Sequence, residues 1–210
     1  MRKRTKVSIL LLIVVSLSLL FTGCDQGVEY GSVTGEVKDS KTKKTIEGVD
    51  IKIGNKSTTS NSNGRWKIEE IRVGKQNIQA QKVGYKKYSD TVLVEEENNT
   101  YNISLDIKEF NLNITTQGNG SVSKDPDKET YNYGDQVSIT ANPETGWKFK
   151  EWQGASTAKT TTITVDVKEQ TDITAVFEKK EYSLNVTVEG KGNVNIDPDE
   201  HTYNYGDPVT

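Results

Sequence analysis

The chain has 210 residues, a formal net charge of −3, one histidine and one cysteine, and only 32% of its residues are hydrophobic. A negative chain without a block of basic residues does not fit a nucleic-acid-binding protein. The single cysteine excludes an internal disulfide, and the single histidine leaves too few ligands for a zinc peptidase site.

The first 23 residues have the composition of a bacterial export signal. Four basic residues lie within the first six positions, an apolar run follows over 7–21, and the small residues Thr22 and Gly23 come next. The apolar run has about 15 residues, fewer than the roughly 18–20 that a membrane-spanning helix needs. The pattern therefore predicts a short signal helix that is removed by a peptidase after Gly23.

The signal ends on Leu20-Phe21-Thr22-Gly23-Cys24, which resembles a bacterial lipobox although Phe21 replaces the usual leucine. The resemblance implies that Cys24 becomes an acylated N-terminus, so we predict an exported, membrane-anchored lipoprotein at the cell surface or facing the periplasm. Several acyl chains give a stable anchor. An ordinary secretory signal with an incidental cysteine is the alternative. Without the signal the chain has 23 basic and 30 acidic residues, a charge of −7.

Residues 31–107 alternate apolar and polar side chains and show no helical period. Val33, Gly35 and Val37 share one face of a predicted strand, and Asn61-Ser62-Asn63-Gly64 marks a turn between two strand-like runs. Turn signals recur about every 8–12 residues, as in a β-sandwich. The segment is therefore predicted to be all-β.

Several motifs of this segment together resemble a carboxypeptidase regulatory-like domain. The resemblance implies a transthyretin-like sandwich of seven strands that serves as a non-catalytic accessory domain. Gly64 is predicted to adopt a positive φ angle in a tight turn, and Gly84 to permit a turn or bulge before Tyr85. The motifs that carry the resemblance are Gly35-Glu36-Val37, the stretches 48–53 and 58–68, Gly74, and the stretch 80–85.

The C-terminal half contains an internal repeat with a constant offset of 72 residues. The hexapeptide Thr-Tyr-Asn-Tyr-Gly-Asp at 130–135 recurs unchanged at 202–207. The first copy spans 110–181 and the second spans 182–210. Their motif order closely resembles the divergent InlB B-repeat, a bacterial surface repeat found in tandem arrays. The resemblance implies small all-β tandem domains.

The second copy stops before the positions that correspond to Trp147 and Trp152. Half a repeat cannot close its hydrophobic core, and an open β-edge invites aggregation. We therefore expect the sequence to be a piece of a longer protein with large aromatic residues near positions 219 and 224. A pseudogene, or a half-domain swapped between chains, is the alternative.

No catalytic, cofactor or metal site is predicted. A serine or cysteine nucleophile needs a nearby base, and the one histidine, His201, aligns with Glu129 in the other copy. Asp125-Pro126-Asp127 offers two carboxylates for calcium, but without a third at EF-hand spacing a turn is favoured. Gly118-Asn119-Gly120 lacks the GxxxxGK[ST] motif of a phosphate-binding loop and predicts a hairpin turn.

Four aromatic residues are the candidate ligand-binding set: Tyr131, Tyr133, Trp147 and Trp152. Aromatic rings combine a large contact area with little lost conformational entropy, so an exposed set could stack on sugar rings. The alternative is that Trp147, Phe149 and Trp152 form the core, because a domain of about 70 residues needs its aromatic side chains inside.

The sequence therefore predicts a non-enzymatic surface lipoprotein that acts as anchor, spacer and interaction scaffold. Its expected partners are the membrane, through Cys24, and a glycan or protein on a surface. A glycan-binding adhesin is one alternative, and the N-terminal accessory region of an extracellular enzyme is another. The predicted order is a signal peptide (1–23), a tether (24–30), the sandwich (31–107) and the two repeat copies (110–181 and 182–210).

Overall fold

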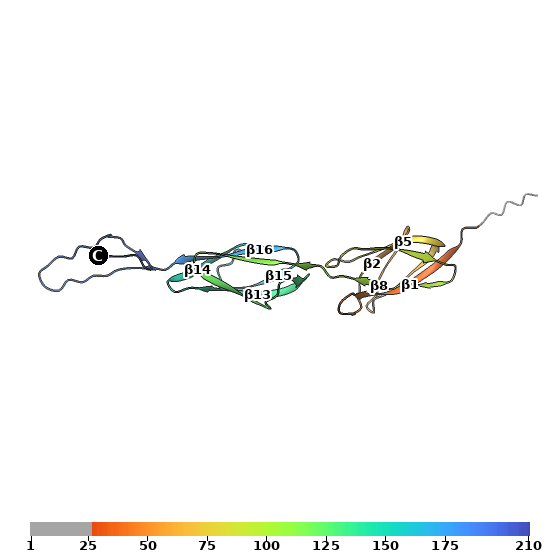
Figure 1. Cartoon of the computed structure of the whole chain (residues 1–210), viewed down its shortest axis with the longest axis horizontal. Coiled ribbons are helices and arrows are strands. Elements are labelled where there is room, and N and C mark those ends of the chain that lie inside the picture. The colour runs from red at the N-terminus through yellow and green to blue at the C-terminus, as the bar shows by residue number, and fades with distance from the viewer. Residues whose placement is uncertain (1–26) are drawn as a thin grey trace, which may run out of the picture.

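The computed structural model describes residues 27–210, and the regular structure in this range consists of β-strands. Two β-domains and a smaller third segment follow one another along the long axis (Figure 1). Between residues 27 and 210 no helix is long and apolar enough to cross a membrane. The predicted signal helix and Cys24 lie outside the described residues.

The first domain is a sandwich of two sheets. One sheet has the order β4-β1-β7 with β8 also paired to β1, and the other has the order β3-β2-β5-β6. Strands β7 and β8 both run parallel to β1, so counted as one interrupted strand they complete the seven that we predicted. The strands are β1 (Tyr30–Asp39), β2 (Asp50–Ile53), β3 (Lys56–Thr59), β4 (Arg65–Arg72), β5 (Gly74–Gln81), β6 (Tyr88–Val94), β7 (Asn98–Thr100) and β8 (Ile103–Leu105).

The core of this domain follows from the alternation of its strands. Successive side chains of a strand point to opposite faces of the sheet, so every second residue turns inward. In β2, Ile51 and Ile53 are fully buried, and in β4, Trp66 and Ile68 are nearly so. The predicted positive φ angle at Gly64 is confirmed, at 72°. Gly84 lies in a turn before Tyr85, as predicted, and its φ angle is 87°.

The interruption between β7 and β8 is bridged by hydrogen bonds to β1. The backbone N–H of Tyr101 donates to the carbonyl oxygen of Thr34 at 2.7 Å. On the other side of the break, the N–H of Glu36 donates to Oδ1 of Asn102 at 2.9 Å. Gly35 lies between these two bonds and faces the carbonyl oxygen of Tyr101.

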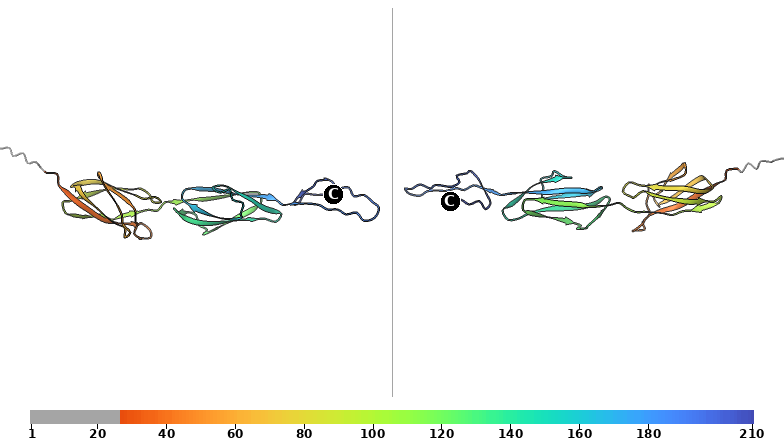
Figure 2. Two further views of the ribbon diagram at one scale, coloured as in Figure 1. Left: turned by 180° about the vertical axis from the view of Figure 1, so that it is seen from behind. Right: turned by 45° about the horizontal axis from the view of Figure 1, so that its top comes forward.

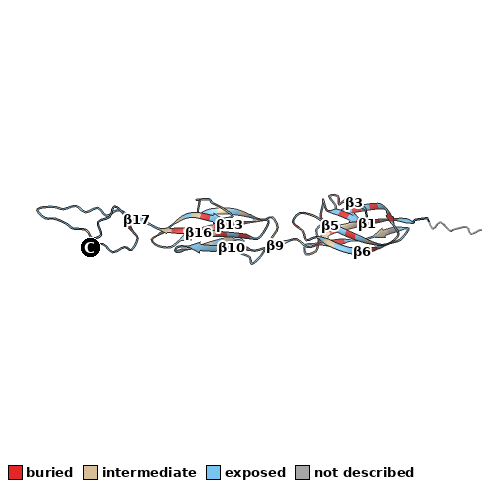
Figure 3. Cartoon of the chain, turned by 90° about the horizontal axis from the view of Figure 1, so that it is seen from above, coloured by how far each residue is buried: buried red, intermediate tan, exposed pale blue. Residues whose placement is uncertain are grey.

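The second domain, repeat 1, packs two three-stranded sheets, β10-β16-β14 and β11-β13-β15, with β9 and β12 as a separate pair. β10 runs parallel to β16, and the other paired strands are antiparallel. Figure 3 shows its buried residues as a group separate from those of the first domain. The strands are β9 (Glu109–Phe110), β10 (Leu112–Gln117), β11 (Gly120–Asp125), β12 (Tyr131–Asn132), β13 (Asp135–Pro143), β14 (Trp147–Gly154), β15 (Thr162–Val167) and β16 (Thr171–Lys179).

The prediction of a hairpin turn at Gly118-Asn119-Gly120 is wrong. β10 pairs with β16 whereas β11 pairs with β13, so this turn carries the chain from one sheet to the other. A Cβ atom at Gly118 would overlap the carbonyl oxygen of Phe177, and one at Gly120 would lie 2.5 Å from its ring. The two glycines therefore let the backbone pass closely over Phe177 as it changes sheets.

The second copy has two short strands, β17 (Glu181–Tyr182) and β18 (Tyr203–Asn204), which pair as β9 and β12 do in repeat 1. Leu184 is 47% exposed, whereas the equivalent Leu112 of repeat 1 is 6% exposed. Leu112 is covered in the core of repeat 1, to which β13, β14 and β16 contribute. The 210 residues contain no counterparts of β14 and β16, which accounts for the exposure of Leu184.

Candidate functional site

The structure separates the four aromatic residues of the candidate ligand-binding set. Tyr131 and Trp152 are 1% and 0% exposed and belong to the core of repeat 1. The Trp152 ring lies 5.2 Å from that of Phe149, and its Nε1 donates to the carbonyl oxygen of Thr160 at 3.0 Å. Both buried residues are therefore held by the fold and are closed to a ligand.

Tyr133 and Trp147 are half-buried and lie at opposite ends of repeat 1. The ring of Tyr133 covers Gly84 of the first domain. Trp147 packs near Gly118 and directly follows Gly146, which the ring of Tyr205 from the second copy covers. The four aromatic residues thus form no shared exposed face on which a sugar ring could stack.

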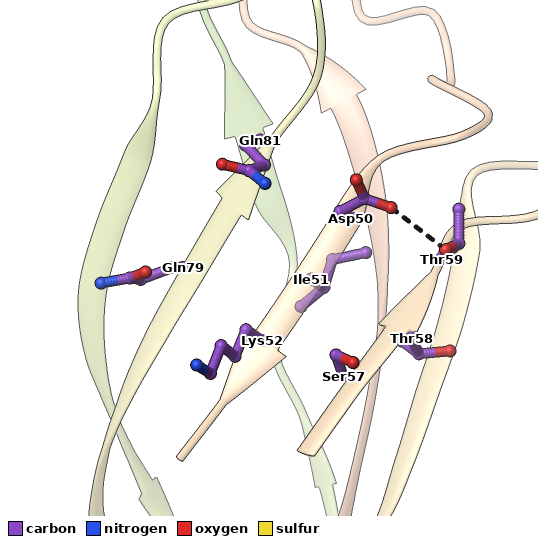
Figure 4. Close-up of a pocket in the computed structure, with 8 residues that line it drawn as sticks. All are labelled: Asp50, Ile51, Lys52, Ser57, Thr58, Thr59, Gln79 and Gln81. Carbon is purple, nitrogen blue, oxygen red and sulfur yellow. Dashed lines mark hydrogen bonds between the residues drawn. The ribbon is translucent and has the colours of Figure 1, made fainter. Parts of the chain in front are cut away.

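A shallow groove on the outer face of β2, β3 and β5 is lined instead by polar groups (Figure 4). Asp50 lies between Thr59 and Gln81 on the neighbouring strands, and Thr59 Oγ1 donates to Asp50 Oδ1 at 3.2 Å. These three residues form one row across the strands, and a second row consists of Ser57, Lys52 and Gln79. The polar groups of both rows can hydrogen-bond a polar ligand.

Sequence reasoning did not single out this groove, because polar residues at alternate strand positions are the normal solvated face of a half-buried sheet. The signal that could have found it is cross-strand register, which places Lys52 beside Gln79 and Asp50 beside Gln81. Register depends on which strands pair, and β2 and β5 are joined only after two intervening strands. The groove is one of several shallow, polar-lined surfaces on the first domain.

A hydroxyl–carboxylate cluster joins β6 to the segment between β7 and β8. The hydroxyls of Tyr88 and Tyr101 lie 2.9 Å apart, and both donate to Oδ2 of Asp90. The hydrogen bond from Tyr101 is the main cause that lowers the pKa of Asp90. Burial, followed by the hydrogen bond to Asp90, raises the pKa of Tyr101. A tyrosine held neutral in this way is a structural clamp and a poor nucleophile.

The clamp predicts a loss of stability in alkali. A tyrosine in the unfolded chain ionises at about pH 10, whereas the pKa of folded Tyr101 is raised. The stabilisation is therefore complete below the unfolded pKa and is lost as the pH rises through the folded value. We expect Tyr101→Phe to be less stable than the parent at pH 8 and to show a smaller decline above pH 10. Urea unfolding of both proteins at pH 8 and above pH 10 checks this. An equal alkaline decline of the free energy of unfolding in both proteins would contradict it.

Within residues 27–210 no group of three or more histidine, cysteine, aspartate or glutamate side chains is placed to hold a metal ion. Asp127 forms an ion pair with Lys124 at 2.9 Å. The hydroxyl of Tyr131 donates to the carbonyl oxygen of Pro126 at 2.9 Å and closes the loop between β11 and β12. Asp125 is the last residue of β11, and Pro126 and Asp127 begin the loop that leads to β12.

The sequence matches two domain families. Residues 33–116 match the CarboxypepD_reg-like domain and residues 110–181 match the divergent InlB B-repeat domain. The two matches overlap over 110–116, where β10 pairs with β16 and so belongs structurally to repeat 1. No curated protein matches the chain.

Several solved structures are similar to this chain at low sequence identity. The Bacillus anthracis TIE protein has a TM-score of 0.51 and 15% identity over 73% of this chain and 35% of its own, so this chain spans about a third of its length. A "putative carbohydrate binding protein" from Bacteroides uniformis has a TM-score of 0.36 and 12% identity, covering 72% of this chain and 80% of its own. A streptococcal ancillary pilin has a TM-score of 0.35 and 12% identity, with coverages of 72% and 62%. From the family matches, the chain carries a CarboxypepD_reg-like domain followed by a divergent InlB B-repeat domain, in the predicted order.

Proposed function

We propose that this chain is a non-catalytic bacterial surface lipoprotein that anchors to a membrane through Cys24 and holds its distal parts away from that membrane. The observation that carries the proposal is the end-to-end arrangement of the domains, seen from two further directions in Figure 2. Each domain receives the chain at one end and releases it at the other. In such an arrangement, each additional domain makes the molecule longer.

The placement of the anchor fits this role. The lipobox-like sequence ends at Cys24, and the first strand, β1, begins at Tyr30. A tether of so few residues keeps the first domain close to the lipid surface, since an extended chain spans at most about 3.3–3.6 Å per residue. Repeat 1 and the second copy then extend from the opposite end of the first domain (Figure 2).

The scaffold role agrees with the chemistry of the described surface. The clamp tyrosine Tyr101 is held neutral, and the one histidine, His201, is solvent-exposed in the second copy. The glycan-binding alternative loses its original support because Tyr131 and Trp152 are buried. A surface glycan or protein partner would instead meet the polar groove of the first domain.

Acylation at Cys24 is the direct test of the anchor. When the full chain is expressed in a bacterium fed radiolabelled palmitate, we expect it to take up label and to sediment with membranes. Cys24→Ser removes the thiol that accepts lipid, so this variant should lose the label. It should also be released from the membrane pellet when the membranes are washed with carbonate. Gly23→Ala keeps a small residue before the cysteine and should behave like the parent. An unlabelled parent protein in the soluble fraction would refute the anchoring role.

A further inference from the structure

The junction between the first domain and repeat 1 is built around one linker residue, Lys108. Its backbone N–H donates to the carbonyl oxygen of Gly84 in the first domain at 2.8 Å. Its own carbonyl oxygen accepts from the backbone N–H of Tyr133 in repeat 1 at 2.8 Å. An ion pair between Lys41 and Glu109, at 2.5 Å, adds a side-chain contact between the first domain and β9. The two domains are thus joined by more than the covalent chain.

The junction between repeat 1 and the second copy has the same construction. The backbone N–H of Lys180 donates to the carbonyl oxygen of Gly146 at 2.8 Å, and its carbonyl oxygen accepts from the N–H of Tyr205 at 2.8 Å. Lys179 forms a longer ion pair with Asp207, at 3.8 Å. Lys108 and Lys180 are separated by the repeat offset of 72 residues, and so are Tyr133 and Tyr205. Gly84 and Gly146, in contrast, belong to two different folds. The similarity of the glycine sites is therefore not explained by the internal repeat.

Each of these two glycines occupies the same place in a tight turn. The N–H of Tyr85 donates to the carbonyl oxygen of Lys82 at 3.1 Å, and that of Trp147 donates to Glu144 at 3.0 Å. In both turns the glycine is the third residue, with φ angles of 87° and 81°, and an aromatic residue follows. A positive φ at this position is the requirement of a type II turn and favours glycine. We call this turn the glycine socket.

The tyrosine of the following repeat covers the socket. A Cβ atom added at Gly84 would lie 2.6 Å from Cδ1 of Tyr133, and one added at Gly146 would overlap Cδ1 of Tyr205. Any larger residue would therefore displace the ring as well as strain the turn. The absence of a side chain in the socket is what lets the ring approach the backbone.

The loop that supplies the tyrosine has the same internal bonds in both copies. Asn132 donates its backbone N–H to Oδ2 of Asp135 at 3.1 Å, and Asn204 donates to Asp207 at 2.9 Å. In each copy, the buried tyrosine that lies two positions before the socket-covering tyrosine donates its hydroxyl to a proline carbonyl oxygen. The distance is 2.9 Å for Tyr131 and 2.7 Å for Tyr203. The second copy keeps this geometry with only β17 and β18. The docked loop is therefore held by its own contacts without the remaining strands of a repeat, and a loop held in this way has less conformational freedom to lose on docking.

We propose that the glycine socket is a docking surface for the Tyr-Asn-Tyr-Gly-Asp loop of a following InlB B-repeat, and that docking fixes the orientation of each repeat on the domain before it. The partner that the socket fits is thus the N-terminal end of another such repeat. Because the two sockets occur on two different folds, recognition depends on the turn and its glycine. The inference goes beyond the proposed anchoring role and holds whether or not Cys24 is acylated.

The test measures the distance between the first domain and repeat 1 in the full chain. Cys24→Ser removes the native thiol, and spin labels are attached to cysteines that replace the exposed Gln79 in β5 and Thr164 in β15. The protein is purified in detergent, and double electron–electron resonance gives the distance distribution. We expect one narrow distribution in the parent and at least about a twofold broader one in Tyr133→Ala, because undocked domains move relative to each other.

Tyr133 is in neither hydrophobic core, so its replacement should leave both domains folded, which circular dichroism checks. Gly84→Ala should broaden the distribution in the same way. Gly74→Ala is the matched control, because Gly74 also has a positive φ, 107°, but nothing lies within 4 Å of its Cβ position. It should keep the narrow distribution. A distribution as narrow in Tyr133→Ala as in the parent would overturn the proposal.

Discussion

Trp152→Ala should unfold repeat 1 and leave the first domain folded. The indole is fully buried, packs on Phe149 and donates a hydrogen bond to the Thr160 carbonyl. Truncation of a buried tryptophan to alanine costs about 3–5 kcal/mol. A single core in a domain of this size supplies only about 3–5 kcal/mol of net stability. The expected loss therefore equals the whole stability of the repeat.

Differential scanning calorimetry resolves this outcome, because the two domains have separate cores and should give separate transitions. We expect the transition of repeat 1 to disappear in Trp152→Ala, with that of the first domain shifted by no more than a few degrees. Leu93→Ala is the control, since Leu93 is 59% exposed and surface substitutions usually change stability by less than about 0.5 kcal/mol. Two unchanged transitions in Trp152→Ala would contradict the core assignment.

Trp152 is therefore a poor position at which to test ligand binding by mutation. Loss of sugar binding in Trp152→Ala would report unfolding, because the side chain is closed to solvent. Substitutions in the polar groove give a cleaner measurement. Gln79 and Gln81 are exposed on β5, so their truncation removes hydrogen-bonding groups without opening the core.

The sequence was sufficient to predict the all-β class because alternation is a local property. Ile51 and Ile53 are buried together since residues two apart share a face of a strand. The same rule fails for Tyr131 and Tyr133. β12 ends at Asn132, so Tyr131 enters the core whereas Tyr133 turns to the neighbouring domain. The contact that holds Tyr133 is with Gly84, far away in sequence, and no local pattern encodes it.

The change of sheets at Gly118-Asn119-Gly120 could not be predicted for a related reason. Two glycines around a polar residue indicate a turn, but they do not say which strand the chain will pair with afterwards. In the structure Phe177 of β16 lies under the turn and β11 pairs with β13. The outcome depends on long-range strand pairing, which the local turn signal does not contain.

Gly35→Ala should be the most damaging small substitution in the first domain. A Cβ atom there would overlap the carbonyl oxygen of Tyr101 and would lie 3.0 Å from Cζ2 of Trp66. Overpacking usually costs about 1–3 kcal/mol. We expect about 3 kcal/mol, because neither neighbour can easily move: Tyr101 is bonded to Thr34, and Trp66 is buried in the core.

Urea unfolding of Gly35→Ala measures this cost, with Gly27→Ala as the matched control because nothing lies within 4 Å of that Cβ position. Hydrogen exchange adds a local readout: amides of β8 should lose protection, since the methyl group pushes Tyr101 away from β1 and β8 follows directly. A neutral Gly35→Ala would mean that Tyr101 can move away from β1 at little cost in stability. The two parallel pairings, Ser32–Thr34 with β7 and Val37–Asp39 with β8, would then be fixed by core packing and not by the close approach at Gly35.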